Sequence, residues 1–162
     1  MNAGKEQGRV PLMNTQHETG TVEAIAYRPT DGLTMQLLDE CEVLAGRGLA
    51  LENRRAGKRE ITLLSVERWA DACRELGAEV PWTFRRANLL IRGIDLAAQI
   101  GKTLTIGPVR VLVHGETRPC GIMDAQHPGL KTALVPCVRG GVHAEVLRGG
   151  VVRKGDAVRI DD

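Results

Sequence analysis

The chain has 162 residues, a formal net charge of +2 and 43% hydrophobic residues, while Phe, Trp and Tyr together make up only 2%. This length is typical of one domain that can bury a core, and that core must be aliphatic. The small charge argues against nucleic acid as a partner, and the chain lacks the run of about 18 apolar residues that would predict a membrane span.

The cysteines and the first residues of the chain bear on metal sites and compartment. Four cysteines are present, Cys41, Cys73, Cys120 and Cys137, and none of them forms a C-x-x-C pair, so no structural zinc site is predicted. The chain begins without the apolar segment of a signal peptide, and we therefore expect a cytoplasmic protein with reduced thiols.

Most of the chain is predicted to be β-structure. Residues 1–18 are polar and without a period, which predicts a flexible tail, and residues 19–162 are predicted to form one domain. Strands are predicted where apolar and polar residues alternate or where β-formers cluster: residues 20–27, 40–44, 60–64, 89–91, 102–106, 109–115, 142–147 and 157–160. Turns at residues 28–32 and 148–150 and the 19 glycines fit this pattern.

Helices are predicted at a few places only. Ser65 is expected to cap a helix that Gly77 ends, with the apolar stripe Val66, Trp69, Ala70, Cys73 and Leu76. Residues 95–99 predict one helical turn, and residues 121–134 predict a helix, a turn and a short helix. Roughly seven strands with one good helix predict a closed or nearly closed β-barrel with helices packed outside.

Cys120 is the leading candidate for chemistry. It lies between Pro119 and Gly121, at the expected start of a helix, and Arg118 adds a nearby positive charge. Both features favour a thiolate, and a soft thiolate suits a soft or high-valent metal, or a persulfide. The alternative is a core cysteine. Cys137 would form a redox pair with Cys120 if the two were close.

Arg85, Arg86, Asn88 and Arg92 form a second candidate group. The planar guanidinium matches two phosphate oxygens, so an Arg/Asn cluster at the start of a strand could hold a phosphorylated cofactor. The alternative is structural, with Asn88 fixing a turn and the arginines solvated. We favour the structural interpretation for Arg92 and leave both open for Arg86 and Asn88.

Arg139, Gly140 and Gly141 form a third group. Glycines there let a backbone approach a ligand or a neighbouring strand, and two N–H groups could hold an anion. A tight barrel corner explains them equally well. His143 is interpreted as a hydrogen-bonded structural residue.

Three segments together resemble a known family. Residues 86–89 read Arg-Ala-Asn-Leu, residues 115–124 carry Arg-Pro-Cys-Gly, and residues 139–156 open and close with paired glycines. In this order and spacing they resemble the MOSC domain, found at the C-terminus of molybdenum-cofactor sulfurases, over residues 19–162. The resemblance implies a mainly β fold, a MOSC-type, pyruvate-kinase-like β-barrel with a few peripheral α-helices.

The resemblance also implies a cofactor and its ligands. Cys120 matches the family cysteine that ligates molybdenum, so we expect molybdenum cofactor here. The residues expected to hold that cofactor are Arg85, Arg86, Asn88, Arg118, Arg139, Gly140 and Gly141. Pyridoxal phosphate is not expected, because Lys102 and Lys131 are ordinary surface lysines and no clear Schiff-base lysine is present.

Family members that act alone resemble reductases of N-hydroxylated and other N-oxygenated compounds, which implies a small-molecule substrate. The sequence has no dinucleotide fingerprint and no haem-attachment motif, so electrons must come from a separate donor protein. The oligomeric state stays open, a homodimer included. Two other functions are compatible with the sequence. One is a carrier of persulfide sulfur or of cofactor, and the other is a barrel that serves only as an interface for a partner.

One loop departs from the family pattern. The family often reads Gly-Leu-x-Gly-Asp-x-His after its second strand, whereas this chain reads Gly-Leu-Ala-Leu-Glu-Asn over residues 48–53. Leu51 and Asn53 are taken to hold the positions of the family's Asp and His. That loss puts the substrate, and even the activity, in question.

Overall fold

The computed structural model describes residues 19–30, 34–52 and 56–161. Its strands are β1 Thr19–Tyr27, β2 Gln36–Leu38, β3 Glu40–Leu44, β4 Gly48–Leu49, β5 Ile61–Ser65, β6 Leu89–Arg92, β7 Thr103–Ile106, β8 Val109–Glu116, β9 Val142–Arg148, β10 Gly150–Arg153 and β11 Ala157–Ile160. Its helices are α2 Val66–Leu76, α3 Gly121–Gln126 and α4 Leu130–Leu134, with 3₁₀ turns η1 Trp82–Arg85, η2 Leu96–Gln99 and η3 Pro136–Val138. The predicted tail at 1–18 lies outside the described residues.

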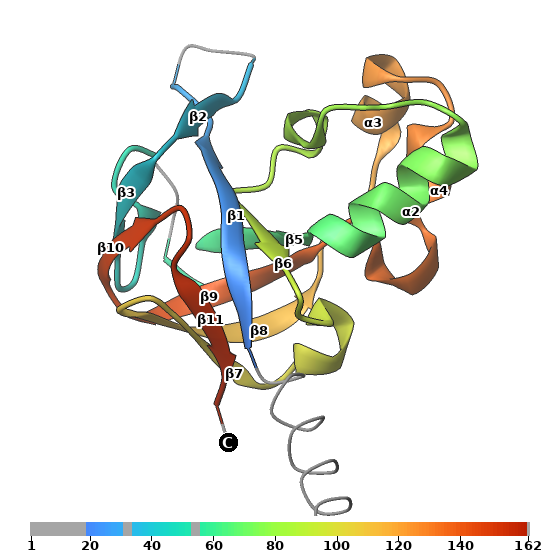
Figure 1. The fold of residues 1–162 in the computed structure, drawn as a ribbon. Helices are drawn as coiled ribbons and strands as arrows, with labels where there is room; N and C mark the ends of the chain where they lie inside the picture. Colours follow the sequence, from blue (N-terminus) through green and yellow to red (C-terminus); the bar gives the residue numbers. More distant parts are fainter. Residues whose placement is uncertain (1–18, 31–33, 53–55, 162) are drawn as a thin grey trace, which may run out of the picture.

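Seven of the described strands close into a barrel, in the order β11-β7-β8-β9-β5-β6-β1 (Figure 1). β1 closes the ring because its first residues pair with β11 and its middle pairs with β6, while its last residues pair with β2. β5 and β6 run parallel, joined by a crossover that contains α2 and η1. The predicted β-barrel with peripheral helices is confirmed.

A second, three-stranded sheet in the order β10-β3-β4 lies beside the barrel. Residues 40–44, predicted as a strand, form β3, which pairs with β10 and not with a strand of the ring. β10 lies outside the predicted strands. The turn that follows it is stabilised by Gly155 at φ 91° and by the Asp156 carboxylate, which accepts a hydrogen bond from the Arg153 N–H at 2.8 Å.

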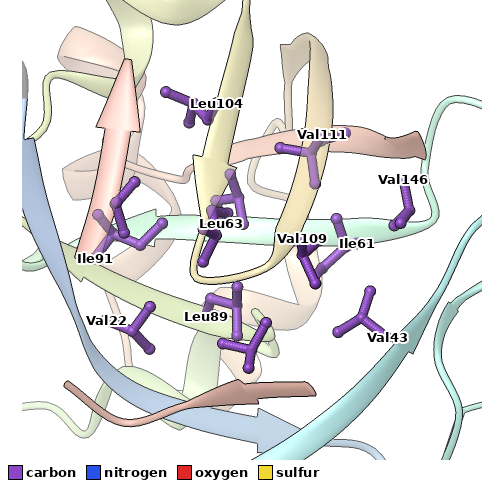
Figure 2. Close-up of a cluster of buried hydrophobic side chains, with 14 of the residues drawn as sticks. Val22, Val43, Ile61, Leu63, Leu89, Ile91, Leu104, Val109, Val111 and Val146 are labelled. Carbon is purple, nitrogen blue, oxygen red and sulfur yellow. The ribbon is translucent and has the colours of Figure 1, made fainter. Parts of the chain in front are cut away.

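The barrel interior is filled by aliphatic side chains from every strand of the ring, and Val43 of β3 packs with them. Figure 2 shows part of this cluster. The fully buried members include Leu63, Leu89, Ile91, Leu104 and Val111. Because the chain has so few aromatic residues, branched aliphatics supply this packing. Burial of each such side chain stabilises the folded state by about 1.5–3 kcal/mol.

A second apolar cluster lies between the outer wall of the barrel and the helices, which gather on one side of it in Figure 1. Leu90 points outward into this cluster while its neighbours in β6 point inward, so β6 is apolar on both faces. Ser65 caps α2 by accepting from the Arg68 N–H at 3.1 Å, and Gly77 ends it at φ 68°.

The apolar stripe of α2 needs one correction. Trp69 is buried as predicted, but Ala72 is the other fully buried residue of the helix, whereas Ala70 is only half-buried. Ala72 is buried because α2 packs on two sides, against α4 and against the barrel strands. No helix in the described part of the chain is long and apolar enough to cross a membrane.

Candidate functional site

A cavity of about 220 Å³ opens on the outer wall of the barrel, where β5, η1 and the start of α3 meet. The residues that line it come from five separate segments of the chain: Arg28, Arg59, Thr62, Leu63, Arg85, Arg86, Ala87, Thr117, Cys120, Ile122, Met123 and Gly140. One thiol and four arginines therefore share one small space, with no Asp or Glu among the described lining residues.

Cys120 occupies the N-cap position of α3, at the strand-to-helix junction that the sequence predicts. Its side chain is exposed and lines the cavity, and its carbonyl accepts from the Met123 N–H at 2.9 Å. α3 has only six residues, so the helix adds little electrostatic field of its own. The positive charge around the sulfur comes from the arginines.

Arg85 is the buried arginine of the cavity, with 8% of its surface exposed. Its Nε donates to the Gly140 carbonyl and its Nη2 donates to the Thr117 carbonyl, both at 2.7 Å. In the described part of the chain no carboxylate forms an ion pair with it. Burial lowers the pKa of Arg85, a charged Cys120 sulfur opposes that shift, and the charge on Arg59 adds to it. A buried cation in this state favours an anion nearby.

The two adjacent glycines are required by close approach to backbone atoms. A Cβ on Gly140 would lie 2.8 Å from the Thr117 carbonyl oxygen and 3.4 Å from Arg85 Nε. Gly141 has φ 95°, and a Cβ there would lie 2.4 Å from the Leu63 carbonyl oxygen. Gly140 thus contributes to the cavity wall, whereas Gly141 lets the chain pass close to β5.

Arg86 follows η1 in the left-handed conformation, at φ 67°. Its side chain lines the cavity, and its buried Nε has no hydrogen-bond partner among the residues that the structure describes. Burial and the charge on Arg28 both lower the pKa of Arg86, while a charged Cys120 raises it. A buried donor without an acceptor indicates that the site is completed by a ligand or by water.

Asn88 lies outside the cavity lining and is fully buried. Its carbonyl oxygen accepts from the N–H and the hydroxyl of Thr62, both at 3.1 Å. Its amide nitrogen donates to the Ala26 carbonyl at 3.2 Å and to a Glu52 carboxylate oxygen at 3.0 Å. Asn88 therefore ties together β1, β5 and the loop that contains Glu52, and the structural interpretation accounts for all of its polar atoms.

Arg118 and Arg139 also lie outside the cavity lining. Arg118 is exposed beside Cys120 in the chain. Arg139 points toward α2 and α4, where its Nη1 donates to Glu75 at 2.7 Å and to the Ala133 carbonyl at 2.9 Å. Arg92 pairs with Glu23 at 3.1 Å on the surface, in keeping with its solvated assignment.

Two of the four arginines of the cavity were missed from the sequence, Arg28 and Arg59. Arg28 follows β1 in a predicted turn, and Arg59 lies in a basic, glycine-containing loop. Neither position carries a motif, so only the tertiary structure brings them to the cavity.

Four further residues were named from the sequence. Cys137 is exposed at φ 56° in η3. His143 pairs with Thr62 and Gly115 in the sheet register, and burial, Arg59, His114 and Lys58 lower its pKa. It was interpreted as hydrogen-bonded, but its buried Nδ1 has no partner among the described residues.

The assignment of Leu51 and Asn53 to the family's Asp and His positions is wrong. Counted from Gly48 along the family pattern, the Asp position falls on Glu52 and the His position on residue 54, so the chain keeps a carboxylate there. Leu51 is 53% exposed, and Asn53 lies outside the described residues.

The described residues contain no group of three or more His, Cys, Asp or Glu side chains that could hold a metal by itself. A metal at Cys120 would need most of its ligands from another molecule. The donor set fits a metal that arrives with its own sulfur ligands inside an anionic cofactor, since the protein then supplies one soft thiolate and several cations.

The fold is a closed barrel whose outer wall carries a single thiol in an arginine-lined cavity. The sequence matches the family model of the MOSC domain over residues 50–159. The chain therefore belongs to the MOSC domain family, whose domain is associated with molybdenum cofactor.

Solved structures show the same fold. The YuaD protein from Bacillus subtilis is similar with a TM-score of 0.71 at 20% identity, covering 88% of this chain and 95% of that one. YiiM from Geobacillus stearothermophilus is similar with a TM-score of 0.72 at 17% identity, covering 88% and 75%. YiiM from Escherichia coli has a TM-score of 0.65 at 15% identity, covering 88% and 70%. No curated protein matches the chain in sequence.

Proposed function

We propose that this protein binds molybdenum cofactor with Cys120 as a ligand of the molybdenum, and that it reduces N-hydroxylated and other N-oxygenated small molecules. The observation that carries the proposal is an exposed thiol inside an arginine-lined cavity, in a chain that belongs to the MOSC domain family.

The residues present fit the cofactor in charge and in donor type. The cavity offers a soft sulfur ligand in a positively charged lining to a group that is itself anionic. The buried Thr117 hydroxyl, which has no hydrogen-bond partner among the described residues, is a donor that such a group could engage. Ligand pockets commonly span about 300–1,000 Å³, so a cavity of about 220 Å³ would take the metal end and leave the rest of the cofactor outside it.

Cys120 would bind the metal, and Arg85 would hold Cys120 in position. Arg85 bonds the Thr117 carbonyl just before Cys120 and the Gly140 carbonyl across the cavity, so it fixes two walls at once. Leu63, Ala87 and Met123 are buried and apolar, and they restrict water on the inner side. When bound, the cofactor supplies the two-electron chemistry.

The overall reaction needs electrons from outside the chain. In the reduction of an N-hydroxylated compound, the N–O bond breaks, two electrons and two protons are taken up, and an amine and water leave. A separate electron-donor protein is part of the proposal, because the sequence lacks a dinucleotide fingerprint and a haem-attachment motif.

The exposed Cys120 side chain also supports a second candidate function, that of a sulfur carrier. An accessible thiol beside several cations could carry sulfur as a persulfide and pass it to another enzyme. This carrier would need neither a substrate pocket nor an electron donor.

Metal and sulfur analysis separates the two functions. The protein is produced in a host with intact molybdopterin synthesis, and molybdenum, pterin and labile sulfur are measured per chain. The reductase proposal expects molybdenum and pterin in the wild type and in Cys137→Ala, and their loss in Cys120→Ala. Labile sulfur at Cys120 without metal would favour the carrier function. A protein with neither molybdenum nor labile sulfur would contradict both functions.

A further inference from the structure

We propose that Arg28, Arg59 and Arg86 form an oxyanion-binding subsite that recognises a carboxylate or phosphate group on the substrate. This subsite makes the preferred substrate an N-oxygenated compound that carries a negative charge. The substrate assignment rests on the proposed function, whereas the binding of an oxyanion does not.

Two of the three segments that carry these arginines are held together by buried polar contacts. The Arg28 N–H donates to a Glu52 carboxylate oxygen at 2.8 Å, and the same oxygen accepts from the Asn88 amide at 3.0 Å. Glu52 is 5% exposed, so it is a buried link between the end of β1 and the segment that contains Arg86. This link ties together the segments that carry Arg28 and Arg86, and both residues line the cavity.

The cations gather without acidic residues among the described lining residues. Burial first, and then the charge on Arg28, lower the pKa of Arg86, while burial and the charge on Arg59 lower the pKa of Arg85, so each pair is close enough for repulsion. Like charges gathered in a cavity attract anions. The buried Arg86 Nε, which lacks a partner among the described residues, supplies a donor that an anion oxygen would satisfy.

The position of the cations favours the substrate over the cofactor as the source of the anion. The arginines share one space of about 220 Å³ with Cys120, the residue that would hold the metal. An anion bound by these cations would therefore lie beside the thiol, where the protein would have to hold the substrate.

The lining also argues against a planar neutral base. The described lining residues include no aromatic side chain, so a ring would find no stacking platform. The contacts that are available are charge-assisted hydrogen bonds from guanidinium groups, which prefer planar carboxylates and phosphates.

The first test uses cofactor-free protein and inorganic sulfate, with binding measured by calorimetry. We expect one sulfate per chain, and we expect Arg28→Gln and Arg59→Gln each to weaken it about tenfold, the size of one lost charge-assisted bond. Arg159→Gln is the matched control, because Arg159 is exposed on β11 and absent from the cavity lining. No binding, or equal binding in all variants, would overturn the subsite. Circular dichroism checks that each variant folds.

The second test repeats the titration with cofactor-loaded protein and identifies the source of the anion. Sulfate that still binds and competes with substrate supports the substrate assignment. Sulfate that binds only without cofactor assigns the arginines to the cofactor phosphate and overturns it.

Turnover gives a third readout. An N-hydroxylated aryl amidine with a ring carboxylate is compared with its neutral carboxamide. We expect Arg59→Gln to raise KM for the carboxylate about tenfold with little change in kcat, and to leave KM for the carboxamide unchanged. Equal effects on both compounds would contradict the proposal. A protein that fails to load molybdenum would sink the proposed function, yet the sulfate result would stand.

Discussion

The interior of the barrel and the cavity on its outer wall are built on opposite principles. The interior is dry and aliphatic, and its side chains belong to strands that pair with their neighbours all round the ring. The cavity gathers four arginines and one exposed thiol from turns, a 3₁₀ helix and the start of a short helix. The comparison teaches that stability and chemistry are separable in this molecule. Changes inside should lower the free energy of unfolding, and changes in the cavity should alter binding.

The largest contrast is expected between Leu89→Ala and Cys120→Ala. Leu89 is fully buried in the barrel, so its truncation leaves a cavity and should lower the free energy of unfolding by about 3–4 kcal/mol. Cys120 is exposed, and Cys120→Ala should change that free energy by less than about 0.5 kcal/mol. Urea denaturation measures both. Equal losses would mean that the thiol belongs to the core.

The next contrast lies between Asn88 and Arg86, two neighbouring positions of the Arg-Ala-Asn-Leu segment. Asn88→Ala leaves several buried groups without partners, so we expect a loss of about 3 kcal/mol in the free energy of unfolding. Arg86→Gln should leave stability nearly unchanged and weaken anion binding. The expected contrast would be contradicted if Asn88→Ala kept the full free energy of unfolding and lost only its bound cofactor.

A smaller contrast separates two glycines at positive φ. Gly141 has φ 95°, and a Cβ there would lie 2.4 Å from the Leu63 carbonyl oxygen. Gly141→Ala should therefore lower the free energy of unfolding by about 2–3 kcal/mol. Gly155 has φ 91° but open space around it, so Gly155→Ala should cost about 1 kcal/mol. Thermal unfolding of the pair checks this order, and equal shifts in Tm would show that close approach at Gly141 does not matter.

The smallest expected effect is a pH dependence from His143. Burial first, and then the charges of Arg59, His114 and Lys58, lower its pKa below the usual 6.5. The unfolded chain therefore binds this proton more readily, so the free energy of unfolding should fall as pH drops through about 6.5. His143→Gln should flatten that part of the pH profile. An unchanged slope would show that other groups set it.

How far the sequence predicts the structure differs between the two regions. Alternating apolar residues, the Ser65 cap and the Gly77 stop are local signals, so the strands at residues 109–115 and 142–147 and the helix α2 were predicted correctly. The alternation at residues 40–44 predicted a strand but says nothing about its partner, so the pairing of β3 with β10 came only from the structure. β10 was too short and glycine-flanked to be recognised.

The cavity was predicted only in part, because convergence is a tertiary property. Cys120, Arg85, Arg86 and Gly140 were named in advance and line the cavity together. Arg28 and Arg59 were missed, since neither lies in a motif and both reach the cavity through long-range contacts. Arg139 was named for its neighbours in sequence, yet its side chain pairs with Glu75 on α2.

X-ray absorption at the molybdenum edge tests the central claim most directly, because it counts the sulfur ligands of the metal. Wild type, Cys120→Ser and the control Cys137→Ser would be loaded with cofactor in the same host. The account predicts one sulfur ligand fewer in Cys120→Ser than in wild type, and no change in Cys137→Ser. An unchanged sulfur count in Cys120→Ser would contradict it.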